Sequence, residues 1–166
     1  MGNSVAGPNP IVAEDSFAKR SVRRLGGGFI LPADERRRLH RRSHLRQQRD
    51  QGEVCGVLLA TRRRCLELIF VSNVSRSPGQ FAMAQSDIRD IRRLARVRKR
   101  AVIGFFHSHP ISTAVPSEGD VRRAPLRSFH LIYDVCGREP KLWYYTRRSH
   151  RLVAIEFPLL IRDSSS

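Results

Sequence analysis

The chain has 166 residues and a mass of 19.0 kDa, which fits one domain with room for a hydrophobic core. It contains no apolar run long enough for a membrane span, and its first residues lack the apolar centre of a secretory signal peptide. Cys55, Cys65 and Cys136 form no CxxC pair, so neither a disulfide framework nor a cysteine zinc site is predicted. We expect a cytoplasmic protein with no membrane partner.

The formal net charge is +16, and all but three of the 31 basic residues are Arg. Such a charge suits nucleic-acid binding. The Arg residues are nevertheless spread along the chain, without interleaved aromatic residues, so nucleic acid is not expected as the main partner. The coding composition of a GC-rich genome explains the Arg excess, and an acidic protein partner is the alternative that bears on function.

Residues 1–27 are rich in Gly, Pro, Ser and Asn and are predicted to form a flexible N-terminal arm. A short strand is expected over 28–31, ended by Pro32. A helix follows over 33–51, with Asp34 as its N-cap and Gly52 at its end. Its apolar residues are mainly Leu39 and Leu45, which predicts a solvated helix lying on a sheet.

The segment 53–60, EVCGVLLA, is predicted to be a buried strand that pairs with 65–73, CLELIFVSN, through a turn at 61–64. A helix over 86–98 is expected to begin with Ser86 as its cap. Its apolar stripe consists of Ile88, Ile91, Leu94 and Ala95. The apolar run 101–106, AVIGFF, is typical of a central strand covered on both faces.

A short helix is predicted from Ser117 towards residue 126, followed by strands at 129–135, 141–146 and 152–157. We expect a catalytic domain over 28–161 and a frayed tail over 162–166.

The segment that follows the 101–106 strand contains the candidate metal ligands, and it reads HSHPISTAVPSEGD. Residues i and i+2 of a strand point to the same face, so His107 and His109 can aim at one point. Asp120 follows eleven residues after the second histidine. Two imidazoles and one carboxylate leave an open position on a tetrahedral zinc ion, which is the catalytic arrangement.

The spacing of His107, His109, Ser117 and Asp120 resembles the JAMM (MPN-plus) motif of zinc metalloproteases, which are related to deubiquitinase-like isopeptidases. That motif also requires an upstream Glu, and Glu53 opens a segment similar to the family's Glu-x-Cys-Gly-x-Leu-Leu. The flanks are similar as well, and the resemblance covers about 29–157. The similar flanking residues are Asn73, Pro78, Phe81 and the strand 103–106.

The resemblance implies a single-domain MPN (cytidine-deaminase-like) α/β fold, in which the 33–51 and 86–98 helices flank a curved mixed sheet. It implies one Zn²⁺ per chain, with His107, His109 and Asp120 as metal ligands. The zinc would lower the pKa of its bound water to about 7 and polarise the scissile carbonyl. Glu53 would act as general base, and Ser117 would hydrogen-bond the oxyanion or the water.

Each residue taken singly has a simpler explanation. Ser117 and Asp120 fit a helix capping box, two histidines can be structural, and Glu53 can be an ordinary carboxylate at the end of a strand. The combination at this spacing favours the zinc site, and Ser117 can serve both as cap and in catalysis.

The resemblance implies a zinc metallopeptidase that cuts peptide or isopeptide bonds at the C-terminal tail of a ubiquitin-like protein. Modifier maturation or deconjugation fits this, including roles in bacterial antiphage defence operons with E1/E2-like partners. Processing of a sulfur-carrier protein in cofactor or cysteine synthesis is one alternative, and a non-catalytic MPN scaffold is another. Deamination is disfavoured because Cys136 lacks the Pro-Cys-x-x-Cys context. Short loops favour the compact bacterial or archaeal form.

Overall fold

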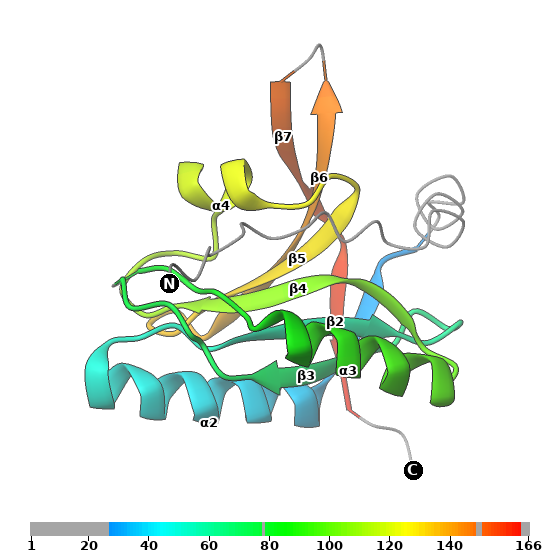
Figure 1. Ribbon diagram of the computed structural model, residues 1–166, viewed down its shortest axis with the longest axis horizontal. Coiled ribbons are helices and arrows are strands. Elements are labelled where there is room, and N and C mark those ends of the chain that lie inside the picture. The colour runs from blue at the N-terminus through cyan, green and yellow to red at the C-terminus, as the bar shows by residue number, and fades with distance from the viewer. Residues whose placement is uncertain (1–26, 78, 149–150, 164–166) are drawn as a thin grey trace, which may run out of the picture.

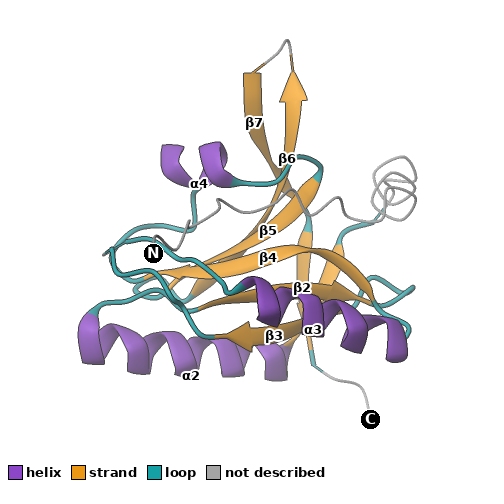
Figure 2. Ribbon diagram, viewed as in Figure 1, coloured by secondary structure: helices purple, strands orange, loops and turns teal. Residues whose placement is uncertain are grey.

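The computed structural model describes residues 27–77, 79–148 and 151–163. Within them lie eight strands and three helices (Figures 1 and 2). In chain order the elements are β1 Phe29–Pro32, α2 Ala33–Asp50, β2 Cys55–Ala60, β3 Leu66–Val71, α3 Gln85–Val97, β4 Ala101–His109, α4 Glu118–Arg123, β5 Ser128–Asp134, β6 Glu139–Arg148, β7 Arg151–Phe157 and β8 Leu159–Arg162. The predicted arm, apart from Gly27, and the last three residues of the predicted tail lie outside the described residues.

Six strands form the main sheet, in the order β3-β2-β4-β5-β6-β7. Neighbouring strands are antiparallel except β4 and β5, which are parallel and joined by a connection that contains α4. The sheet turns along its width, so that the β6–β7 hairpin stands across the direction of β2 and β3 (Figure 1). The predicted curved mixed sheet flanked by helices is therefore confirmed.

The sheet is buried on both faces at β2, because successive side chains of a strand point to opposite sides. Leu58 and Ala60 pack in one cluster with Leu39 of α2. Val57 and Leu59 pack in the other with the apolar stripe of α3. The helices α2 and α3 thus cover opposite faces of the sheet.

None of the helices in the described part of the chain has the length and apolarity of a membrane span.

A second, two-stranded sheet pairs β1 with β8 in parallel. No strand was predicted at the position of β8. Arg162, which was expected in a frayed tail, is the last residue of β8 and lies opposite Pro32. The Phe29 ring of β1 packs against the rings of Phe129 and Phe157, with centroids 4.9 and 5.8 Å apart. This small sheet therefore closes the α2 side of the core.

The predicted helix caps were wrong at three ends. Pro32 occupies the N-cap of α2, so Asp34 is the second helical residue and contributes its charge to the first turn instead. At the other end Gln51 adopts the left-handed conformation, with φ 53°, in place of Gly52. Ala84 is the N-cap of α3, so Ser86 is the second residue of the helix.

The central strand β4 continues to His109, beyond the apolar run. A Cβ atom on Gly104 would lie 1.8 Å from the carbonyl oxygen of Phe129 on β5, so only glycine permits this close approach of the two strands. Because β4 is paired with β5 as far as His109, the backbone that carries both histidines is fixed by strand pairing.

Candidate metal centre

His107 and His109 project from the end of β4 toward the same side of the sheet, as predicted. Their Nε2 atoms lie 3.0 Å apart, and both side chains are buried. Two imidazole nitrogens at this separation cannot both carry a proton toward each other. The geometry therefore favours rings that present at least one free lone pair to a shared point.

Asp120 reaches the same point from α4. Its Oδ1 lies 3.4 Å from Nε2 of His107, and its Oδ2 lies 3.4 Å from Nε2 of His109. The helix start holds this carboxylate in place, because Ser117 donates to Oδ2 from its backbone N–H at 2.8 Å and from its hydroxyl at 2.6 Å. Ser117 Oγ in turn accepts from the Asp120 N–H, which completes a capping box.

The neighbouring groups orient the two imidazoles. Nδ1 of His109 lies 2.7 Å from the carbonyl oxygen of Thr113 and donates to it, which leaves Nε2 as the lone-pair nitrogen. The ring of Phe81 stacks on His107, with centroids 4.6 Å apart. The cluster thus has one histidine fixed by a hydrogen bond and the other by an aromatic face.

The pKa shifts of Asp120 and His107 are those expected at a cation site. Burial alone would raise the pKa of Asp120, but the proximity of the two histidines and the hydrogen bonds from Ser117 outweigh it and hold that pKa well below its usual range. Burial lowers the pKa of His107, which favours the neutral ring. One nitrogen of each histidine and one carboxylate oxygen lie within 4.8 Å of one another. His107, His109 and Asp120 can therefore hold a metal ion, and the donor set fits zinc.

Glu53 lies beside this cluster because β2 and β4 pair antiparallel. Val54 N–H donates to Ser108 Oγ, and Ser108 N–H donates to the Val54 carbonyl oxygen, both at 2.9 Å. Cys55 is the partner of His107, and two more residues along this register place Glu53 opposite His109. The predicted strand began at Glu53, whereas β2 begins at Cys55, so Glu53 precedes the strand.

The Glu53 carboxyl is buried, with a residue exposure of 6%, and its Oε2 has no hydrogen-bond partner among the described residues. Burial raises its pKa to about 7, while His109 and Arg123 act in the opposite direction and the Asp120 carboxylate adds to the rise. A carboxyl with a pKa near neutrality can take up and release a proton at working pH, which is the property of a general base.

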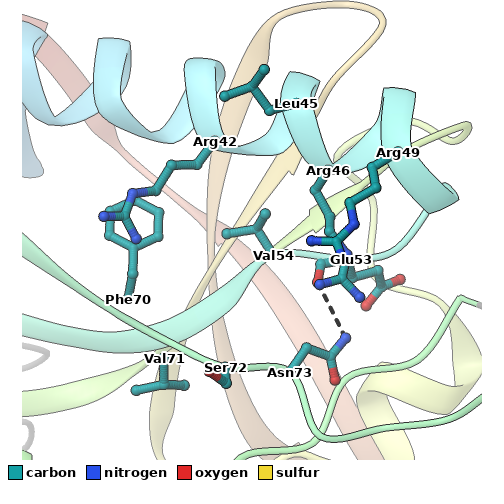
Figure 3. A pocket seen from close by; sticks show the side chains of 10 residues that line it. All are labelled: Arg42, Leu45, Arg46, Arg49, Glu53, Val54, Phe70, Val71, Ser72 and Asn73. Atoms are coloured by element: carbon teal, nitrogen blue, oxygen red, sulfur yellow. Dashed lines mark hydrogen bonds between the residues drawn. The ribbon is translucent and has the colours of Figure 1, made fainter.

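Asn73 fixes the backbone of Glu53 and the loop that follows β3. Its side-chain amide donates to the carbonyl oxygens of Glu53, at 3.1 Å, and Gln80, at 3.0 Å. Its side-chain oxygen accepts from the N–H groups of Ser75 and Ala82, each at 3.0 Å. All four hydrogen-bonding positions of the amide are used, and Figure 3 shows the contact with Glu53.

A buried polar layer lies close to the cluster. His130 of β5 packs against Tyr145, with ring centroids 4.3 Å apart, and its Nε2 lies 3.0 Å from Ser128 Oγ. Burial lowers the pKa of His130 to about 3, so this ring is neutral. It does not belong to the three-residue cluster.

The structure brings the predicted metal ligands to one point and places Glu53 and Ser117 beside them. Sequence reasoning gave no role to Ser108 or Thr113, which act through a hydroxyl and a backbone carbonyl that no motif reveals. Asn73 and Phe81 were noted only as flanking similarities. The catalytic roles of Glu53 and Ser117 stay predictions.

Comparison with known proteins gives a family. A family model described as prokaryotic homologs of the JAB domain matches residues 35–148. A curated desampylase from Pyrococcus furiosus is 33% identical over 69 residues, which are 42% of this chain and 49% of the desampylase. The chain thus spans about half the length of this curated relative.

Two solved structures share the fold. A solution structure of a protein from Desulfitobacterium hafniense has a TM-score of 0.65 and 21% identity, covering 82% of this chain and 94% of that chain. A solution structure of a protein from Salinibacter ruber has a TM-score of 0.52 and 18% identity, covering 83% and 94%. At these identities the likeness concerns the fold alone.

Proposed function

The chain belongs to the family of prokaryotic homologs of the JAB domain, and on that premise we propose that it is a zinc-dependent peptidase or isopeptidase. The observation that carries the proposal is the convergence of His107, His109 and Asp120 beside the buried carboxyl of Glu53. A scaffold protein has no need of three buried ligands together with a carboxyl whose pKa is near neutrality.

The proposed chemistry divides among these residues. His107, His109 and Asp120 would hold one zinc ion, and a bound zinc would acidify water and polarise the scissile carbonyl. Glu53 takes a proton from the attacking water on its carboxylate and passes it to the leaving amine. Its Oε2, which has no hydrogen-bond partner in the described part of the chain, is the atom available for that transfer.

Ser117 has two tasks in this scheme. Its hydroxyl donates to Asp120 Oδ2 and so orients a metal ligand. To donate to the developing oxyanion instead, the hydroxyl has to turn away from Asp120, because a hydroxyl has one proton to give.

The proposed substrate is the C-terminal tail of a ubiquitin-like protein, and the match to a protein named desampylase supports this class. Such tails are extended and can pair with an exposed sheet edge. β3 is an edge strand of the main sheet, and the chain leaving it reaches Asn73, which contacts Glu53. A tail lying along β3 would therefore be led toward the Glu53 end of the metal cluster.

Mass spectrometry tests this proposal. The zinc-loaded chain would be incubated with ubiquitin-like proteins from the same organism, each extended by a short peptide or joined through its terminal Gly to a Lys side chain. We expect a new C-terminus at the terminal Gly of at least one of them. If both the linear and the isopeptide forms of the whole set stay intact, the proposal is rejected.

A further inference from the structure

A cavity of about 350 Å³ opens between the second half of α2 and the end of β3 (Figure 3). Glu53 and Asn73 line one end of it, and Phe70 lines the other. Its volume lies within the range of about 300–1,000 Å³ that is common for ligand pockets. The cavity is thus large enough for side chains of a bound peptide, and it ends at the residue proposed as general base.

Arginine dominates the α2 wall of this cavity. Arg42, Arg46 and Arg49 all line it, since positions separated by three, four and seven residues share one helix face. Figure 3 shows the side chains of Arg46 and Arg49 extending from α2 toward Glu53. The fourth member of this helix wall is Leu45, which is 59% exposed. The wall is therefore cationic.

The cations differ in how they are neutralised. Arg46 donates from Nε to Asp50 Oδ1 at 2.7 Å, so its charge has a partner. Arg49 has no ion-pair partner among the described residues. Arg42 lies over the ring of Phe70, with its guanidinium carbon 4.4 Å from the ring centroid, and has no carboxylate partner within the described chain. Two guanidinium groups are thus left to pair with an incoming anion.

We propose that this pocket binds acidic side chains of the substrate within a few residues of the scissile bond, one held by Arg49 at the Glu53 end and one by Arg42 at the Phe70 end. The proposal rests on the proposed function for the position of that bond. A guanidinium group matches a carboxylate through two parallel hydrogen bonds. The Arg42 guanidinium carbon lies over the Phe70 ring, and a guanidinium group that stacks on an aromatic face keeps its edge donors for such a pair.

The helix sets the reach of the pocket. Arg42 and Arg49 are seven residues apart on α2, which is about 10 Å at 1.5 Å per residue. An extended peptide advances about 3.3 Å per residue, so this length corresponds to about three substrate residues. Acidic residues within about four positions of the cleaved bond would therefore reach the two guanidinium groups, one each, while the bond lies beside Glu53.

Binding of labelled peptides to the zinc-loaded full chain tests the proposal, with fluorescence anisotropy as the readout. One ten-residue peptide has three Glu residues before an internal Gly-Gly pair, a second has them after it, and the control peptides have Gln instead. We expect one of the two Glu peptides to bind about tenfold more tightly than its Gln control, the size of one good hydrogen bond to a charged group.

Two variants with equal charge separate the pocket from the general basicity of α2. Arg42→Gln with Arg49→Gln removes two cations from the cavity, whereas Arg37→Gln with Arg41→Gln removes two exposed cations that do not line it. The Glu preference should disappear in the first variant and persist in the second. An equal loss in both, or no Glu preference in the wild type, overturns the proposal.

Two further arms separate this inference from its alternatives. In the first, a single-stranded oligonucleotide of matched charge replaces the peptide. If it binds more tightly than the Glu peptide and loses this binding in the pocket variant, the pocket is a phosphate site and the proposal is contradicted. The Glu preference should survive zinc removal by a chelator, because the pocket contains no proposed metal ligand. Failure of cleavage with a retained Glu preference would reject only the proposed function.

Discussion

The side-chain amide of Asn73 donates to the backbone carbonyl oxygen of Glu53 at 3.1 Å, and thereby ties the end of β3 to the residue that precedes β2. The same amide holds the loop that carries Phe81, whose ring stacks on His107. One side chain therefore supports both the proposed base and one proposed metal ligand.

Removing this amide should affect activity and stability together. Asn73→Ala is expected to lower the free energy of unfolding by about 1–3 kcal/mol, because buried hydrogen bonds are lost. Cleavage should slow by about tenfold or more, because Glu53 is displaced. Denaturant unfolding and initial rates measure the two effects. Gln80→Ala is the control, since Gln80 offers only its backbone carbonyl to Asn73.

Asn73→Asp separates the donor role of the side-chain amide from its acceptor role. A carboxylate can still accept from the N–H groups of Ser75 and Ala82, but it cannot donate to the Glu53 carbonyl. We expect this variant to cleave its substrate more slowly than the wild type, even when the loop after β3 keeps its conformation. Wild-type rates in Asn73→Asp would show that the contact with Glu53 has no part in positioning the base.

Metal content should depend on the three-residue cluster. The purified protein is expected to contain one zinc per chain, and His107→Ala and Asp120→Ala should each lose it, because two ligands do not hold a catalytic zinc. Elemental analysis of the purified variants measures this. His44→Ala replaces an exposed histidine of α2 and should keep its zinc; a full zinc load in His107→Ala would exclude the assigned site.

The free energy of unfolding of the metal-free protein should depend on pH through the titration of Glu53. The folded state holds a proton on Glu53 up to a pKa of about 7, whereas the ordinary value is 4.5. The folded state binds more protons between these values, so stability falls as pH rises through this window. The contribution is complete below pH 4.5 and lost above pH 7, and it amounts to at most about 3 kcal/mol.

Urea unfolding with a chelator, at a series of pH values, tests this titration. Glu53→Gln should flatten the fall between pH 4.5 and 7 relative to the wild type. Glu35, whose pKa is also raised by burial, is present in both proteins and cancels in the difference. Parallel stability curves for the two proteins would mean that Glu53 does not titrate near neutrality.

Ser117 should influence metal affinity through Asp120. Ser117→Ala removes the hydroxyl that donates to Asp120 Oδ2 and the cap of α4. We expect zinc affinity to fall by about 10- to 100-fold, as for other groups that orient a ligand, and stability to fall by about 1 kcal/mol. Competition with a chelator measures the affinity. Ser117→Thr restores the hydroxyl and should recover it; Ser112→Ala is an exposed control.

The strands and the α3 helix could be predicted because local patterns decide them. Three members of the predicted stripe, Ile88, Ile91 and Ala95, are buried on the sheet as their spacing indicates, whereas Leu94 is half-buried. Of the two apolar residues noted in α2, Leu39 is buried and Leu45 is 59% exposed. The buried residues of α2 are Glu35, Leu39 and Ser43, and Leu45 lines the cavity instead.

The convergence of His107 and His109 was predictable because β4 is a strand, and a strand brings residues i and i+2 to the same face by its own geometry. The support of the site was not predictable in this way. Pairing of β8 with β1, the Thr113 carbonyl and the Ser108 hydroxyl depend on contacts between segments far apart in sequence. Such contacts follow from the tertiary fold rather than from a local pattern.

The most direct test of the central claim is the cleavage rate of Glu53→Gln with its zinc content verified. Gln has the shape of Glu53 but cannot take up the proton, so the account predicts one zinc per chain and a rate at least about 100-fold below that of the wild type. Cleavage by Glu53→Gln at the wild-type rate, with zinc bound in both proteins, would contradict it.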